Sequence, residues 1–277
     1  MTIQESIDAV KDLVPKEIPA DLQSACKCEP LDPAWPIGGP LDALKFLMAW
    51  ERYDNQEIHP CSDISHRITH SHHYEYADLI KYGVEEVYKK SLATKYVSIG
   101  WHLAGRYNMD NGLIGELDRI GWPKLKFLDF GAAPWIQSIF YRQKGLSVTT
   151  VNQTLDSDCH RFGRFMACCL GITDIKEFAS DAIWDKAQYD VVYCVDVLEH
   201  IPPLEDGAPG WVPLAERLLS CWKKGGVGYL NAPFGLEGGA IKPVESHPVH
   251  YTSPFSLEGW LDAHGVKQEG YFWRKVQ

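Results

Sequence analysis

The chain of 277 residues lacks any apolar run close to the roughly 18 residues that a membrane-spanning helix needs. Its first residues contain no basic segment followed by an apolar one, so we expect no secretory leader. Internal repeats and low-complexity tracts are also missing. Basic residues are outnumbered, 27 against 37 acidic ones, and the resulting net charge of −10 argues against a nucleic acid as partner.

The eight cysteines are scattered along the chain and form no compact framework. Together with the expected lack of a leader, this distribution favours reduced thiols and a cytoplasmic protein. Apolar residues make up 45% of the chain and aromatic residues 12%, which excludes disorder as the main state. Nothing in the pattern specifies an oligomeric state.

Up to residue 123 the pattern predicts helices and loops. Apolar residues recur at helical spacing in 3–14, 41–50 and 75–92. The segment 59–73 contains five of the eleven histidines. That segment is either part of a polar lid near a substrate mouth or a metal site, and its spacing matches no standard zinc module. We expect 1–123 to form a helical N-terminal cap.

From residue 124 to 277, short apolar strands alternate with helices. The expected strands are 124–130, 147–152, 172–178, 189–196, 225–233 and 266–276, and the expected helices are 134–144, 157–170, 212–222 and 253–265. This alternation predicts an α/β, Rossmann-like domain with a mostly parallel sheet and helices on both faces. Ligands of such sheets bind beyond the carboxyl ends of the strands.

The segment Phe127–Trp135 (FLDFGAAPW) places a glycine turn directly after an expected strand. Gly131 and the small residues after it allow the backbone to approach a ligand closely. The N-terminus of the following helix favours a carboxylate or a phosphate. By itself this turn is compatible with other nucleotide-binding folds.

Four segments in order carry a family resemblance: LDFGAAP, YDVVYCVDVLEHIPP, WKKGGVGYLNAPFG and HYTSPFSLEGWLDAHGV. Together they resemble the motifs of class I S-adenosylmethionine (SAM)-dependent methyltransferases, over about 124–275. The resemblance implies SAM as cofactor and methyl transfer to a small-molecule acceptor, most readily to a hydroxyl oxygen. In the Leu-Glu-His region the chain is similar to ubiquinone-biosynthesis O-methyltransferases.

The resemblance also implies a cofactor-binding set after the first four strands. Its members are Asp129, Gly131 and Ala133 at the methionine end, Asn152 at the ribose, Asp181 and Ala182 at the adenine amino group, and Asp196 beside the transferred methyl group.

The chain departs from the family pattern in three places. Asn152 stands where an acidic residue usually binds the ribose, and it supplies a donor and an acceptor but no charge. Gly-Ala-Ala-Pro-Trp stands where relatives often have Gly-x-Gly-x-Gly. Little chain follows the last expected strand, so we expect the antiparallel hairpin that normally completes the sheet to be missing or contributed differently.

The segment Asp196–His200 (DVLEH) follows the expected fourth strand, and a loop after the fifth carries His247 and His250. Carboxylates and imidazoles there suit a divalent ion such as Mg²⁺ that chelates vicinal hydroxyls. The resemblance implies Asp196, Glu199, His200 and His247 as its ligands. Without an ion, Glu199 and His200 shape the pocket through local hydrogen bonds, or His200 or His250 acts as general base beside Asp196.

Two other functions fit parts of this pattern. The acidic-x-x-Glu-His set with a later histidine is similar to that of small-RNA 3′-terminal 2′-O-methyltransferases, against which the acidic net charge counts. The altered glycine turn and Asn152 are compatible with a non-catalytic protein that binds a partner through the fold.

Overall fold

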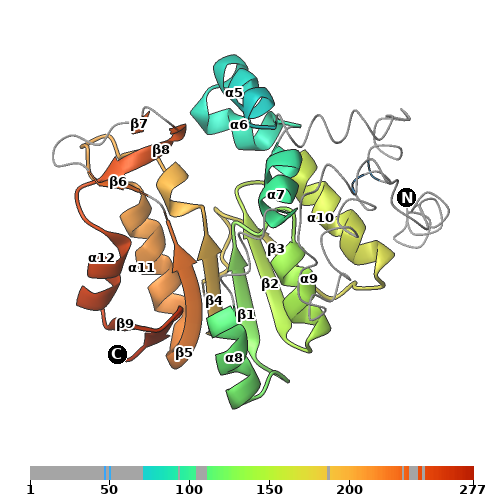
Figure 1. Ribbon diagram of the computed structural model, residues 1–277, viewed down its shortest axis with the longest axis vertical. Coiled ribbons are helices and arrows are strands. Elements are labelled where there is room, and N and C mark those ends of the chain that lie inside the picture. Colours follow the sequence, from blue (N-terminus) through green and yellow to red (C-terminus); the bar gives the residue numbers. More distant parts are fainter. Residues whose placement is uncertain are drawn as a thin grey trace. The chain divides into compact units, whose positions relative to one another are not determined.

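The computed structural model describes Leu47, Trp50 and residues 71–92, 94–103, 111–185, 188–232, 234–236, 243–244 and 247–277 (Figure 1). The expected helix at 3–14, most of that at 41–50 and the side chains of the histidine-rich segment 59–73 lie outside the described residues. No described helix is both long and apolar enough to cross a membrane.

The chain divides into two compact units. One contains the described residues of Met1–Asn108 with Ala133–Gln143 and Thr154–Ile175, and the other contains Met109–Ala132, Lys144–Gln153 and Lys176–Gln277. The units therefore alternate along the chain, and the division into 1–123 and 124–277 stays a prediction about domains.

The second unit contains a seven-stranded sheet in the order β3-β2-β1-β4-β5-β10-β9. Its strands are β1 (Lys126–Phe130), β2 (Ser147–Asn152), β3 (Lys176–Ala179), β4 (Tyr189–Val195), β5 (Trp222–Asn231), β9 (Val266–Glu269) and β10 (Phe272–Lys275). The first five in this order pair in parallel, and β10 is antiparallel to both its neighbours. The predicted Rossmann-like α/β fold with a mostly parallel sheet is confirmed.

Helices lie on both faces of this sheet within the second unit: α8 (Asn111–Ile120), α11 (Trp211–Cys221) and α12 (Leu257–Ala263). Trp273 of β10 belongs to a buried cluster with residues of α11 and α12. Arg274, the next residue, bonds to Glu116 of α8. Because successive side chains of a strand point to opposite faces, α8 covers the face opposite to α11 and α12.

The end of the chain corrects one expectation. The segment 266–276, predicted as a single last strand, forms the antiparallel hairpin β9–β10, so the hairpin that we expected to be missing completes the sheet. Gly270 adopts φ +66° in its two-residue turn, a conformation that glycine adopts readily. The sequence Gly-Tyr is not one of the strong hairpin signals, which is why the pattern failed to reveal the turn.

In the first unit the described helices are α5 (Ser71–Tyr82), α6 (Val84–Lys90), α7 (Thr94–Leu103), α9 (Ile136–Gln143) and α10 (Asp158–Cys169). The prediction of one helix over 75–92 was wrong, because Gly83 has φ +76° and ψ 166° and so interrupts the helical backbone. Lys95 of α7 pairs with Asp158 at the start of α10, and both side chains are buried. The buried charges compensate each other, and this pair joins α7 to α10.

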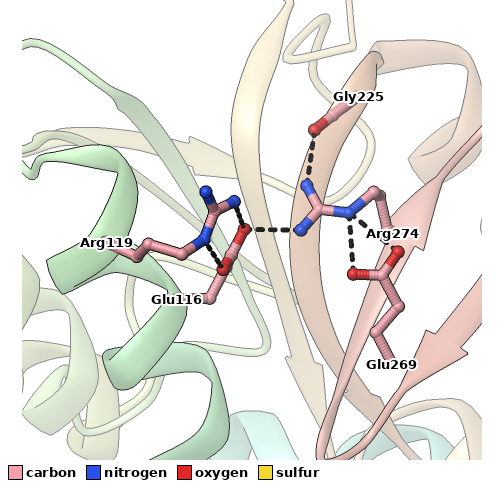
Figure 2. Close-up of polar contacts among 5 residues, drawn as sticks. All are labelled: Glu116, Arg119, Gly225, Glu269 and Arg274. Carbon is pink, nitrogen blue, oxygen red and sulfur yellow. Dashed lines mark hydrogen bonds and ion pairs between the residues drawn. The ribbon is translucent and has the colours of Figure 1, made fainter.

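A charged network ties α8 to the hairpin (Figure 2). Glu116 accepts hydrogen bonds from Arg119 in its own helix and from Arg274 of β10. Arg274 also donates to Glu269 of β9 and to the Gly225 carbonyl. The hydrogen bonds from Arg119, opposed by burial and reinforced by Arg274, lower the pKa of the Glu116 carboxyl to about 2.

We expect Glu116→Gln to lower the free energy of unfolding at pH 7 by about 2 kcal/mol, because the variant loses its ion pairs. Since the folded pKa lies below the ordinary value of 4.5, this stabilisation is complete above about pH 5 and is lost as the pH falls towards 2. Urea unfolding at pH 7 and pH 3 measures both effects. Glu216→Gln, at an exposed position of α11, is the control. Equal losses for the two variants would contradict the role of the network.

Candidate functional site

Polar side chains gather at the carboxyl edge of the parallel strands in the second unit. Asp129 is the second-last residue of β1, and Asn152 is the last of β2. Asp181 follows β3 by two residues, and Asp196 directly follows β4. Asp129 and Asn152 are buried, Asp196 is half-buried, and Asp181 is exposed. Because parallel strands end at one edge, four of the predicted cofactor positions meet there.

At this edge, backbone hydrogen bonds extend the strand pairing by one residue beyond the strand ends. The Gly131 N–H donates to the Val151 carbonyl at 2.8 Å, and the Ser180 N–H donates to the Asn152 carbonyl at 2.7 Å. On the other side of β4, the Asp196 N–H donates to the Asn231 carbonyl at 3.0 Å. The start of each turn is therefore fixed by the sheet itself.

The turns after β1 and β4 touch each other. Gly131 has φ +80°, and a Cβ built on it would lie 2.1 Å from Cγ2 of Val197. Asp196 has φ +54°, an unusual value for a residue with a side chain, and this sharp turn brings Val197 over Gly131. The strand order changes direction between β1 and β4, which is where ligands of such sheets bind.

Cys194 lies near the end of β4, and the pKa of its thiol reflects the negative charge of this edge. Burial raises the pKa of its thiol well above the ordinary value. Nearby carboxylates raise it further, in decreasing order those of Glu199, Asp129 and Asp196. Asp129 of β1 and the carboxylates that follow β4 thus act electrostatically on one point.

A second group of side chains lies beyond β4. Glu199 and His200 belong to the 3₁₀ helix Leu198–His200, and His250 belongs to β8 (His247–Ser253). Their ligand atoms lie within 4.8 Å of one another. The Glu199 side chain is fully buried, and its Oε1 is 3.9 Å from Nε2 of His200. The two imidazole rings meet edge to face at 4.5 Å between centroids.

His250 reaches this group from a small sheet that the sequence did not predict. The expected loop after β5 contains β6 (Gly235–Leu236), β7 (Pro243–Val244) and β8, in the order β6-β8-β7. Val244 pairs with His247 and Pro243 pairs with Tyr251, so the register of β8 shifts between these pairs and His250 lies in the shifted stretch.

The structure brings His250, predicted as a catalytic residue, together with two of the predicted metal ligands. Glu199 and His200 join His250 in a group that can hold an ion, and Asp196 is not a member of this group among the described residues. The side chain of His247 lies outside the described residues, so its role stays a prediction.

Two further predicted cofactor positions have specific surroundings. The Ala182 N–H donates to the Ala179 carbonyl at 3.0 Å, so this donor serves the turn after β3. Ala133 belongs to the first compact unit. In that unit the tryptophan of the altered glycine motif, Trp135, is buried with φ +70° and lies edge-on against the buried His160 at 5.0 Å between ring centroids.

No family model and no curated protein matches the chain. Among solved structures it resembles magnesium protoporphyrin IX methyltransferase (ChlM) from Synechocystis PCC 6803 with bound SAM, with 14% identity over 71% of this chain and 94% of that one and a TM-score of 0.45. A putative sarcosine dimethylglycine methyltransferase from Galdieria sulphuraria shows 17% identity over 60% of this chain and 61% of that one, with a TM-score of 0.39.

The [4+2]-cyclase SpnF shows 16% identity over 60% of each chain, with a TM-score of 0.43. The chain therefore spans about three fifths of the Galdieria protein and of SpnF. With identities of 14–17% and TM-scores below 0.5, none of these likenesses assigns a ligand or an activity to this chain.

We expect Gly131→Ala to lower the free energy of unfolding by about 3 kcal/mol, because the methyl group adds a clash with Val197 to the strained backbone. Gly121→Ala is the matched control, since Gly121 has φ +89° with nothing within 4 Å of a built Cβ, and it should lose about 1 kcal/mol. Adding Val197→Ala to Gly131→Ala should recover part of the difference. Equal losses at positions 131 and 121 in urea unfolding would refute the contact.

Proposed function

We propose that this chain is a class I SAM-dependent methyltransferase that acts on a hydroxyl group of a small molecule. The observation that carries the proposal is the meeting of two motifs at the carboxyl edge. LDFGAAP and VDVLEH lie far apart in the sequence, yet parallel pairing of β1 with β4 and the approach of Val197 to Gly131 bring their turns together. The hairpin β9–β10 supports the same family, because it removes the departure expected at the chain end.

The charge of the edge fits SAM, which carries an ammonium and a sulfonium group besides one carboxylate. The buried Asp129 supplies an acceptor for the ammonium, and Asp196 supplies negative charge near the sulfonium. The Asn152 amide can accept from one ribose hydroxyl and donate to the other. When bound, SAM supplies a methyl group already activated for transfer, so the residues of this chain mainly bind, orient and handle a proton.

His200 and His250 are the residues that we propose for proton transfer. A hydroxyl oxygen that attacks a methyl group must lose its proton, and a neutral imidazole accepts one near pH 7. The buried Glu199 carboxylate, 3.9 Å from His200, stabilises the imidazolium that results. A small acceptor fits better than RNA, because the carboxylates of this edge repel phosphate and the chain carries a net charge of −10.

The same three side chains fit a divalent ion. One carboxylate and two imidazoles form a donor set that suits Zn²⁺, Mn²⁺ or Co²⁺ better than Mg²⁺, which prefers oxygen ligands. Glu199, His200 and His250 would hold the ion. Such an ion would supply a Lewis acid next to the acceptor hydroxyl.

We expect micromolar binding of S-adenosylhomocysteine (SAH) to the purified chain in calorimetric titration. Asp129→Asn should weaken this binding at least tenfold, because the charge-assisted hydrogen bond to the ammonium is lost. Asp262→Asn, an exposed carboxylate of α12 paired with Lys267, should leave the affinity unchanged. If the wild-type chain does not bind SAH, the proposal is wrong. If Asp129→Asn binds as the wild type does, the cofactor lies elsewhere.

We expect His250→Ala to reduce turnover about 100-fold and to leave SAH affinity within twofold, because it removes a proton acceptor and no cofactor contact. The assay is SAH release from SAM with a panel of catechols, phenols and vicinal diols. His264→Ala, an exposed histidine of the same unit, is the control.

The same assay with EDTA separates the two uses of the group. Loss of activity with EDTA and recovery with Mn²⁺ would support the ion, and full activity in EDTA would leave the histidines as bases alone. Turnover by His250→Ala at the wild-type rate would contradict both.

A further inference from the structure

The turn after β3, which we call the β3 loop (Ser180–Asp185), begins at the ribose position. The Ser180 N–H donates to the carbonyl of Asn152, so the loop starts beside the last residue of β2. Trp184 closes the loop, since its indole N–H donates back to the Ser180 carbonyl at 3.1 Å. The Trp184 ring is buried and packs against Phe130 of β1 at 5.2 Å between centroids.

Arg217 of α11 holds this loop by hydrogen bonds from its three guanidinium nitrogen atoms. Nη1 donates to the Ser180 carbonyl at 3.1 Å, and Nη2 donates to the Ala182 carbonyl at 3.2 Å. Nε donates to Oδ2 of Asp185 at 3.0 Å. The guanidinium also lies over the Trp184 ring, 4.5 Å from its centroid. A planar fork of donors suits this set of acceptors, and the single ammonium of lysine cannot reproduce it.

These hydrogen bonds determine which side chains of the loop remain available to a ligand. Arg217 holds the carbonyls of residues 180 and 182, and Trp184 turns into the core. The side chains between them, Asp181 and Ile183, are exposed, and Ile183 is 70% exposed despite being apolar. A carboxylate next to an uncovered apolar side chain suits a flat heterocycle that carries an amino group.

We infer that Arg217 is a positioning residue for the adenine end of the cofactor, holding the β3 loop so that Asp181 accepts from the adenine amino group while Ile183 packs on the ring. This inference rests on the proposed function. If Arg217 only stabilised the fold, its loss would not change which base the chain prefers. Positioning requires that loss of Arg217 reduces discrimination between bases.

The test compares two probes by calorimetric titration: SAH and S-inosylhomocysteine, in which an oxo group replaces the adenine amino group. The wild-type chain should prefer SAH at least tenfold, because the oxo group cannot donate to Asp181. Arg217→Met should weaken SAH binding about tenfold and reduce this preference to twofold or less. Arg217→Lys should retain an intermediate preference and provides a milder change if Arg217→Met fails to fold.

Two further variants provide the controls. Arg142→Met removes an arginine of the first unit that forms a bidentate pair with Asp174, and it should change neither affinity nor preference. Asp181→Asn should abolish the preference, and adding Arg217→Met to it should reduce the preference no further, because both changes act through one contact.

The outcomes separate this inference from the proposed function. A wild-type chain that binds neither probe contradicts the proposed function and this inference with it. A chain that binds SAH without preferring it over S-inosylhomocysteine overturns the inference alone. So does an Arg217→Met variant that melts at a lower temperature but keeps the wild-type preference, since Arg217 would then be structural only.

Discussion

The parallel pairing of β1 with β4 is the constraint on which the candidate site depends. It runs from Phe127 opposite Val191 to Phe130 opposite Cys194, and so aligns the ends of two strands far apart in the sequence. The turns that follow can then meet, with Val197 against Gly131, where a Cβ would clash with it. The strand order changes direction at the same place, so the crossover connections on its two sides lead away from each other. Ligands of such sheets bind in the crevice at this point.

Carboxylates concentrate negative charge at this edge, and this charge limits which ligands the edge can bind. Asp129 and Glu199 are buried, and buried carboxylates are retained only where hydrogen-bond donors or positive charges compensate them. Of the arginines, Arg274 ties α8 to the hairpin, Arg119 bonds to Glu116 within α8, and Arg217 holds the β3 loop. The proposed SAM cofactor, which carries two cationic groups, fits a group of carboxylates better than a polyanion does.

The two sides of the proposed site are built differently. The cofactor side uses the ends of regular strands, whose turns are extensions of the backbone pairing. The acceptor side uses a short 3₁₀ helix and a small sheet inserted after β5, which contribute His200 and His250. Inserted segments vary without disturbing the main sheet, so we propose that substrate specificity arises on this side.

The sequence by itself determined the order of strands and helices from residue 124 to the end of β5 and the positions of Asp129, Asn152, Asp181 and Asp196 at strand ends. It did so because apolar strands and helical spacing are local patterns. The hairpin β9–β10, the break at Gly83 and the meeting of His250 with Glu199 appear only in the tertiary structure. Glycine permits the positive φ found at Gly270 and Gly83 but does not require it, and the place of His250 depends on how β7 pairs with β8, so none of them leaves a periodic signal in the chain.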